Sequence, residues 1–176
     1  MWSKLLAVSF LVGGTYATPL DAGINRRAAC PGVHIFGARE TTVSPGYGSS
    51  STVVNEVLSA YSGSTAEAIS YPACGGQSSC GSVSYSSSVA QGIQAVASAV
   101  NSFNSQCPDT KLVLVGYSQF DERPAGFTCP SASKIQSYCD ASDPYCCNGS
   151  NAATHLGYGA EYGAQALTFI KSKISS

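Results

Sequence analysis

Charged side chains are scarce in this 176-residue chain, where they make up 11% of the residues. Without residues 1–27, six basic residues face nine acidic ones, a net charge of −3. This balance does not favour a polyanionic partner such as nucleic acid or an anionic membrane. A surface with few charges and many Ser, Gly and Tyr residues suits a neutral, hydroxyl-rich or insoluble substrate.

The sequence also lacks the patterns that bind metals. It has two histidines, His34 and His155, far apart in the chain, and none of its eight cysteines forms a C-x-x-C pair. Structural zinc sites use closely spaced cysteine and histidine pairs. We therefore expect no metal site, and we interpret the even set of cysteines as disulfides, for which 105 pairings exist.

The N-terminus has the features of a secretory signal peptide, predicted over residues 1–17. An apolar run, Leu5–Val12, follows a lysine, and the small residues Thr15 and Ala17 precede the expected cleavage site. The run is too short to span a bilayer. Residues 18–27 end in two arginines, which indicate either a propeptide junction or an ordinary exposed arginine pair. The sequence thus predicts a secreted protein.

The mature chain, residues 28–176, alternates strand-like and helix-like patterns. Apolar runs predict strands at Gly32–Gly37, Glu67–Tyr71 and Lys111–Gly116, with another at Lys134–Cys139. Helical spacing of apolar residues predicts helices over Thr52–Tyr61, Val89–Phe103 and Tyr158–Ile170. This order is typical of a parallel sheet covered by helices, an α/β fold.

The order of the strands also predicts one disulfide. Cys30 and Cys107 precede the first and third strands, and neighbouring parallel strands start at the same edge of a sheet. A bond that closes so long a loop stabilises the fold by about 4–5 kcal/mol in the chain-entropy model.

The most apolar strand ends in a candidate nucleophile. Lys111–Gly116 leads into Tyr117-Ser118-Gln119, most of the G-x-S-x-G turn that exposes a catalytic serine above an α/β sheet. The last position of the pattern is Phe120 instead of glycine. A side chain there opposes the close backbone approach that the turn requires.

A base and a carboxylate follow this serine in the order typical of α/β hydrolases. His155 comes after every carboxylate candidate, and either Asp140 or Asp143 precedes it; Pro144 pins the loop and favours Asp143. We expect His34, inside the first strand, to be a core residue. The predicted triad is therefore Ser118, Asp143 and His155.

Several motifs together resemble the fungal acetylxylan esterases of carbohydrate esterase family 5, to which the cutinases are related. The resemblance covers Cys30 to Ile174 and lies in Gly32–Thr42, Gly46–Ser50, Tyr71–Gly76, Gly116–Gln119 and Ser142–Cys147. It implies a cutinase-like and flavodoxin-like three-layer sandwich with a five-stranded parallel sheet. It also implies deacetylation of xylan through an acetyl-serine, with no cofactor.

The resemblance assigns roles to individual residues. Ser118, Asp143 and His155 would be the triad, and the backbone of Gln119 and Thr41 would supply the oxyanion donors. The implied disulfides are Cys30–Cys107, Cys74–Cys80 and Cys139–Cys146. Cys129 and Cys147 would then lack their family partners and could pair with each other.

Compared with the family, the chain passes directly from Gln119 to the loop that normally precedes the last strand. The absent segment would hold the second glycine of the turn, a helix, a strand and two cysteines. We interpret the chain as a splice form or gene-model deletion, short of one strand and one or more helices. We expect the loss to uncover apolar surface of the sheet and to impair activity.

Two other functions stay open at this stage. One is a cutinase acting on polyesters, and the other is a secreted binding protein that keeps the scaffold without the chemistry. We expect a monomer that contacts acetylated xylan or a polyester and no nucleic acid or membrane. Asn148 begins a glycosylation sequon, which is either used or an ordinary surface turn.

Overall fold

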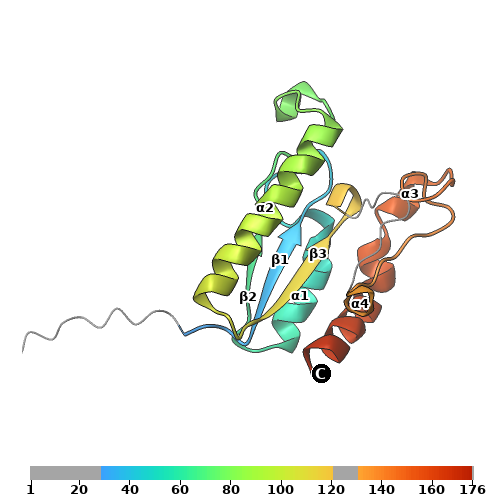
Figure 1. Cartoon of the computed structure of the whole chain (residues 1–176). Coiled ribbons are helices and arrows are strands. Elements are labelled where there is room, and N and C mark those ends of the chain that lie inside the picture. The colour runs from blue at the N-terminus through green and yellow to red at the C-terminus, as the bar shows by residue number, and fades with distance from the viewer. Residues whose placement is uncertain (1–28, 121–130, 176) are drawn as a thin grey trace, which may run out of the picture.

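The structure is a computed structural model that describes residues 29–120 and 131–175 (Figure 1). The predicted signal peptide, the predicted propeptide and Cys129 lie outside these residues. Within the described part of the chain, no helix combines the length and apolarity that a membrane crossing needs.

Three parallel strands form the sheet, in the order β2-β1-β3. They are β1 (Val33–Ala38), β2 (Thr65–Ala68) and β3 (Lys111–Gly116). In the middle strand, Ile35 pairs with Ala66 on one side and Val113 on the other. All six β1 residues are buried, as expected for a continuous apolar run between two neighbours and under helices on both faces.

The helices are α1 (Ser51–Ala60), α2 (Tyr85–Gln106), α3 (Ala152–His155) and α4 (Tyr158–Ile174). Because strand side chains alternate between faces, Val33 and Ile35 pack in one core with residues of α1 and α4. Phe36 and Ala38 pack in the other core with residues of α2. Figure 1 shows the resulting three layers, with α2 on one side of the sheet and α1 and α4 on the other.

This architecture confirms the predicted α/β three-layer class and most of the predicted elements. The interpretation of His34 is also confirmed: the side chain is buried, its Nδ1 lies 2.6 Å from Thr65 Oγ1, and its ring stacks on Phe103 with 3.9 Å between ring centroids. Burial lowers the pKa of His34. This histidine therefore belongs to the core beneath α2.

Two strand predictions need correction. The second strand begins at Thr65 and ends at Ala68, earlier than the predicted Glu67–Tyr71. The strand predicted at Lys134–Cys139 is wrong: the chain there forms a short 3-10 turn, η4 (Ala132–Lys134), followed by irregular backbone. Side-chain contacts hold this segment in place of strand pairing: the Tyr138 ring stacks on Tyr162 with ring centroids 4.7 Å apart.

The most apolar strand, β3, is the outer strand of the described sheet, although its composition is typical of a central strand. Leu114 on β3 is 51% exposed, and Ile93 on α2 is also exposed. Each square ångström of apolar surface left in water forfeits roughly 25 cal/mol. The exposed Leu114 at this edge agrees with our expectation that the segment missing after Gln119 would leave apolar surface of the sheet uncovered.

Three disulfides hold the described chain together. They are Cys30–Cys107, Cys74–Cys80 and Cys139–Cys146, the three pairs that the resemblance implies. The first joins residues 77 positions apart, at the start of β1 and of β3. Cys147 is a free, exposed cysteine in the described part of the chain, and Cys129, the partner that we considered for it, lies outside the described residues.

Candidate active site

The predicted nucleophile lies directly after β3, at the carboxyl edge of the sheet. Ser118 begins a 3-10 turn, η3 (Ser118–Phe120), and has a φ of 55°. A left-handed conformation costs a residue other than glycine about 1–2 kcal/mol. Such a strained turn between strand and helix is what presents the serine in a nucleophile elbow, and Ser118 adopts it although residue 120 is not glycine.

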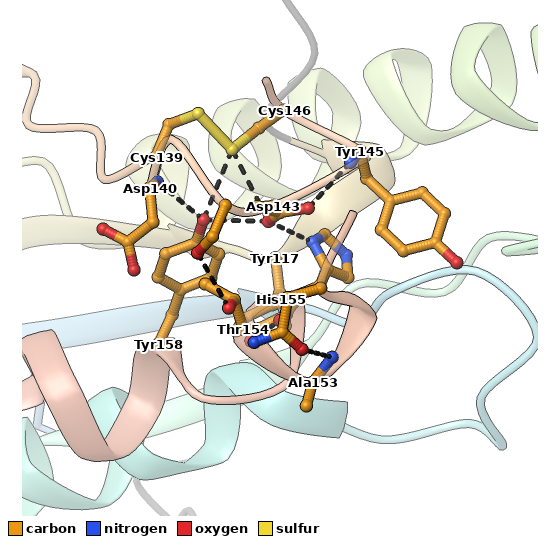
Figure 2. A network of polar contacts seen from close by, with 12 residues as sticks. Tyr117, Cys139, Asp140, Asp143, Tyr145, Cys146, Ala153, Thr154, His155 and Tyr158 are labelled. Atoms are coloured by element: carbon orange, nitrogen blue, oxygen red, sulfur yellow. Dashed lines mark hydrogen bonds and ion pairs between the residues drawn. A yellow bond between two sulfur atoms is a disulfide. The ribbon is translucent and has the colours of Figure 1, made fainter. Parts of the chain in front are cut away.

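The predicted base and carboxylate are in direct contact (Figure 2). His155 is the last residue of α3, and its Nδ1 lies 2.7 Å from Asp143 Oδ2. Of the two aspartates considered, Asp140 lies away from this ring, and its Oδ1 accepts a hydrogen bond from the Tyr162 hydroxyl. The contact on Nδ1 leaves His155 Nε2 as the nitrogen available to a reacting proton.

Asp143 is a fully buried carboxylate with an exposed fraction of 0%. Oδ1 accepts the backbone N–H of Tyr145 at 2.7 Å, and Oδ2 accepts the Tyr158 hydroxyl at 2.8 Å in addition to His155. Burial raises the pKa of Asp143, but these hydrogen bonds and the adjacent imidazole outweigh it, so the pKa lies below the ordinary value. The buried site therefore holds an ionised carboxylate.

The loop around Asp143 is closed by covalent and backbone contacts. The Cys139–Cys146 disulfide joins its ends, and the Asp143 carbonyl accepts the backbone N–H of Cys147 at 3.1 Å and of Gly149 at 3.3 Å. A Cβ added to Gly149 would lie 1.9 Å from the carbonyl carbon of Ser142. Only glycine fits this close approach, a requirement that the sequence pattern did not reveal.

Tyr117 links the serine turn to the histidine loop. Its buried hydroxyl donates a hydrogen bond to the backbone carbonyl of His155, and the two rings lie with centroids 5.7 Å apart. Figure 2 shows Tyr117 beside Asp143 and His155. The residue before Ser118 is therefore packed against the predicted base, a contact that no spacing in the sequence predicted.

The two residues expected to supply oxyanion donors both border the segment Ala73–Gly75. Gln119 is buried, and its Nε2 donates to the Cys74 carbonyl at 3.1 Å. The residue after Thr41 donates its backbone N–H to the Ala73 carbonyl at 2.6 Å. Because the Gln119 side chain is fixed in this way, its backbone orientation is held at the turn beside Ser118.

The surface next to His155 is aromatic and apolar. The Tyr145 side chain is 68% exposed, and its ring centroid lies 4.6 Å from that of His155. Leu156, the next residue along the chain, is also largely exposed. A flat, exposed aromatic ring beside a base can pack against the apolar face of a sugar or an acyl chain.

The loop around Asp143 also carries the predicted glycosylation sequon. Asn148 of the sequon is exposed, as a modified asparagine would need to be. Among the residues that the structure describes, no group of three His, Cys, Asp or Glu side chains could hold a metal ion.

Comparison with known proteins gives the chain a family. The sequence model of the family described as Cutinase matches residues 29–122 and 120–174. The chain belongs to the cutinase family. The two matched segments meet at residues 120–122, immediately after the Ser118 turn.

Several members of this family are closely similar to the chain. Acetylxylan esterase 2 of Talaromyces purpureogenus is 57% identical over 234 aligned positions, which cover 99% of this chain and 100% of the relative. Cutinase 11 of Verticillium dahliae is 47% identical, with 97% of this chain and 78% of the relative covered. A solved acetylxylan esterase structure is 60% identical, with a TM-score of 0.79 and 83% of this chain and 100% of that chain covered.

The lowered pKa of Asp143 predicts a pH-dependent contribution to stability. A carboxyl with a lowered pKa stabilises the fold above its ordinary pKa of 3.8, and the contribution is lost as the pH falls below that value. We expect Asp143→Asn to lower the free energy of unfolding at pH 7, and the difference from the unchanged chain to shrink by pH 3. Urea unfolding at both pH values measures it, and an equal difference at both would contradict the assignment of an ionised Asp143.

Proposed function

We propose that this chain is a secreted serine esterase that removes acetyl groups from xylan. Its membership of the cutinase family and the contact between Asp143 and His155 support ester hydrolysis by a serine triad. The similarity to acetylxylan esterases supports the substrate. Residues 1–17 would be the signal peptide that directs secretion, and residues 18–27 a propeptide.

The observation that carries the proposal is the buried, ionised Asp143 on His155 Nδ1. It fixes the imidazole with a proton on Nδ1 and stabilises the positive charge that forms when Nε2 takes a second proton. An ester hydrolase of this kind needs that proton transfer twice, once from the serine and once from water.

The reaction would run in two acyl-transfer steps. Ser118 Oγ attacks the acetyl carbonyl carbon while His155 Nε2 takes the hydroxyl proton. The bond to the sugar oxygen then breaks, and that oxygen leaves with the proton from Nε2. Water attacks the acetyl-serine by the same path, which releases acetate and regenerates Ser118.

The backbone N–H of Gln119 and a donor from Thr41 would stabilise the negative oxygen of both tetrahedral intermediates. Donors of this type contribute about 10²–10³-fold to the rate in serine hydrolases. The contacts of both residues with the segment Ala73–Gly75 support this role, since they hold the two donors on one framework.

A polyester substrate is the second candidate, because Cutinase 11 is also similar to the chain. It has the lower identity of the two named relatives, and the match covers less of that relative. The exposed tyrosine beside His155 suits either substrate, so the preference comes from the identities and coverages. We therefore favour acetyl groups on a polysaccharide over long acyl chains.

We further propose that the chain lacks a segment after Gln119 that its relatives contain. The alignment with Acetylxylan esterase 2 spans 234 positions, 58 more than the chain has residues. The split match of the family model at residues 120–122 and the position of β3 at the edge of the described sheet agree with a deletion there. The rival function is a secreted binding protein without catalysis. It depends on this shortened connection, because the loss of a segment next to Ser118 would impair the reaction.

Labelling with a fluorophosphonate separates the esterase from the binding protein. We expect the mature chain to take up one probe at Ser118, located by mass spectrometry of the labelled peptide, and the Ser118→Ala variant to take up none. Folded chain without label, or label that persists in Ser118→Ala, would contradict an active triad. Rates on p-nitrophenyl acetate above those on longer esters would separate the acetyl esterase from a cutinase.

The exposed ring of Tyr145 makes a prediction about the polysaccharide. We expect Tyr145→Ala to raise KM for acetylated xylan about tenfold, equivalent to roughly 1.4 kcal/mol, with little change on p-nitrophenyl acetate. Tyr85→Ala is the control, because Tyr85 is another exposed tyrosine and belongs to α2 instead of the Asp143 loop. Equal losses on both substrates would show that Tyr145 supports the site rather than the sugar.

A further inference from the structure

We infer that Tyr158 is a positioning residue for this reaction: its hydroxyl proton, given to Asp143 Oδ2, holds the carboxylate in place for His155. The inference rests on the proposed function. It concerns a residue that neither the G-x-S pattern nor the order of serine, aspartate and histidine identified.

Tyr158 and His155 share one carboxylate oxygen. The Tyr158 hydroxyl lies 2.8 Å from Asp143 Oδ2, and His155 Nδ1 lies 2.7 Å from the same atom. Tyr158 is the first residue of α4, three positions after His155 at the end of α3. Figure 2 shows both side chains converging on Asp143.

The direction of the hydrogen bond from Tyr158 follows from its other neighbours. The backbone N–H of Asp140 donates to the Tyr158 oxygen at 2.9 Å. Cys146 Sγ, 3.3 Å from that oxygen, belongs to a disulfide and carries no proton. Since a phenol has a single proton, and its oxygen already accepts from Asp140, that proton is directed to Asp143.

Tyr158 keeps this proton throughout the working pH range. Burial raises the pKa of Tyr158 to about 12; the Asp143 carboxylate adds to the effect and the Asp140 N–H opposes it. The hydroxyl is therefore a permanent donor. It completes the set of donors on a carboxylate that water does not reach.

Removing this donor makes the Asp143 carboxylate a stronger base and so changes its interaction with His155. Without the Tyr158 proton, Asp143 loses a hydrogen bond that lowers its pKa, and the carboxylate becomes a stronger base toward Nδ1. The protonated imidazole is then favoured, so His155 should take up its second proton at a higher pH.

The titratable groups around His155 come from three elements. Asp143 and Tyr145 belong to the disulfide loop, Tyr158 begins α4, and Tyr117 follows β3. Asp140 lies one step further out, on Tyr158, and Glu40 acts on Tyr117 at longer range. Substitution of Tyr158 by Phe removes one hydrogen-bond donor to Asp143 and leaves the other ionisable side chains in place.

Tyr162→Phe is the matched control. Tyr162 lies one turn further along α4, and its ring packs on Tyr158 with centroids 5.7 Å apart. Its hydroxyl donates to Asp140 instead of Asp143. The control therefore removes the same atom from the same aromatic cluster without touching the carboxylate that His155 uses.

The test is an NMR titration of the histidine ring protons, which needs no catalytic turnover. The chain has two histidines, and buried His34 beneath α2 serves as the internal reference. In Tyr158→Phe we expect the protonation midpoint of the His155 ring to rise by roughly half a pH unit or more. Tyr162→Phe should leave it unchanged, as should both variants for His34.

Activity supplies the second readout. If the wild-type chain hydrolyses p-nitrophenyl acetate, Tyr158→Phe should lower kcat about tenfold, as for loss of one charge-assisted hydrogen bond. The acid limb of its pH–rate profile should move to higher pH. Failure of the wild-type chain to react would count against the proposed function, while the NMR midpoint would still decide the role of Tyr158.

Three outcomes would overturn the inference: an unchanged His155 midpoint in Tyr158→Phe, an equal shift in Tyr162→Phe, or a loss of stability alone. If Tyr158→Phe does not fold, the unchanged chain can still be used to test whether the Tyr158 hydroxyl donates its proton to Asp143. The ring resonances of Tyr158 should then show no ionisation up to pH 11, and ionisation near pH 10 would contradict a proton held by Asp143.

Discussion

The buried carboxylate of Asp143 is the interaction on which the candidate active site depends. An ionised group out of contact with water is stable only where donors replace the lost solvent. Here the backbone of Tyr145, the imidazole of His155 and the hydroxyl of Tyr158 provide them. The same hydrogen bonds that keep the carboxylate charged also set the position of the base.

The rest of the fold brings this loop to the end of the strand that carries the serine. The Cys139–Cys146 bond and the close approach of Gly149 fix the loop itself. Tyr117 then joins the loop to β3 through the backbone of His155. Ser118 adopts its left-handed conformation directly after β3, in a sheet of three described strands.

Much of the fold could be predicted from local patterns. The runs that became β1 and β3 are continuously apolar, and α2 and α4 carry clear helical spacing, so these elements follow directly from sequence. The burial that such a run implies is complete only in β1, because β3 lies at the edge of the described sheet. The segment Lys134–Cys139 misled because an extended apolar pattern does not specify which contacts the segment will make. In the structure a disulfide and the stacking of Tyr138 on Tyr162 hold that segment instead.

The candidate site was predictable only in part, for a physical reason. Serine, aspartate and histidine in a fixed order follow from the chemistry of acyl transfer. Other residues of the site could not be predicted in this way. Tyr117 and Tyr158 make contacts between segments that are distant in the chain, and Gly149 allows two backbone segments to approach closely. Such contacts produce no recognisable spacing in the sequence. Tyrosine is also abundant in this chain, so nothing in the sequence distinguishes Tyr117 and Tyr158 from the other tyrosines.

The bond between Asp143 and His155 can be observed directly. In proton NMR at neutral pH, a hydrogen bond from Nδ1 to an ionised, buried carboxylate should give one strongly deshielded imidazole proton that exchanges slowly with water. The account predicts this resonance in the unchanged chain and in Asp140→Asn, and its loss in Asp143→Asn. Its absence from the unchanged, folded chain, or its survival in Asp143→Asn, would contradict the central claim.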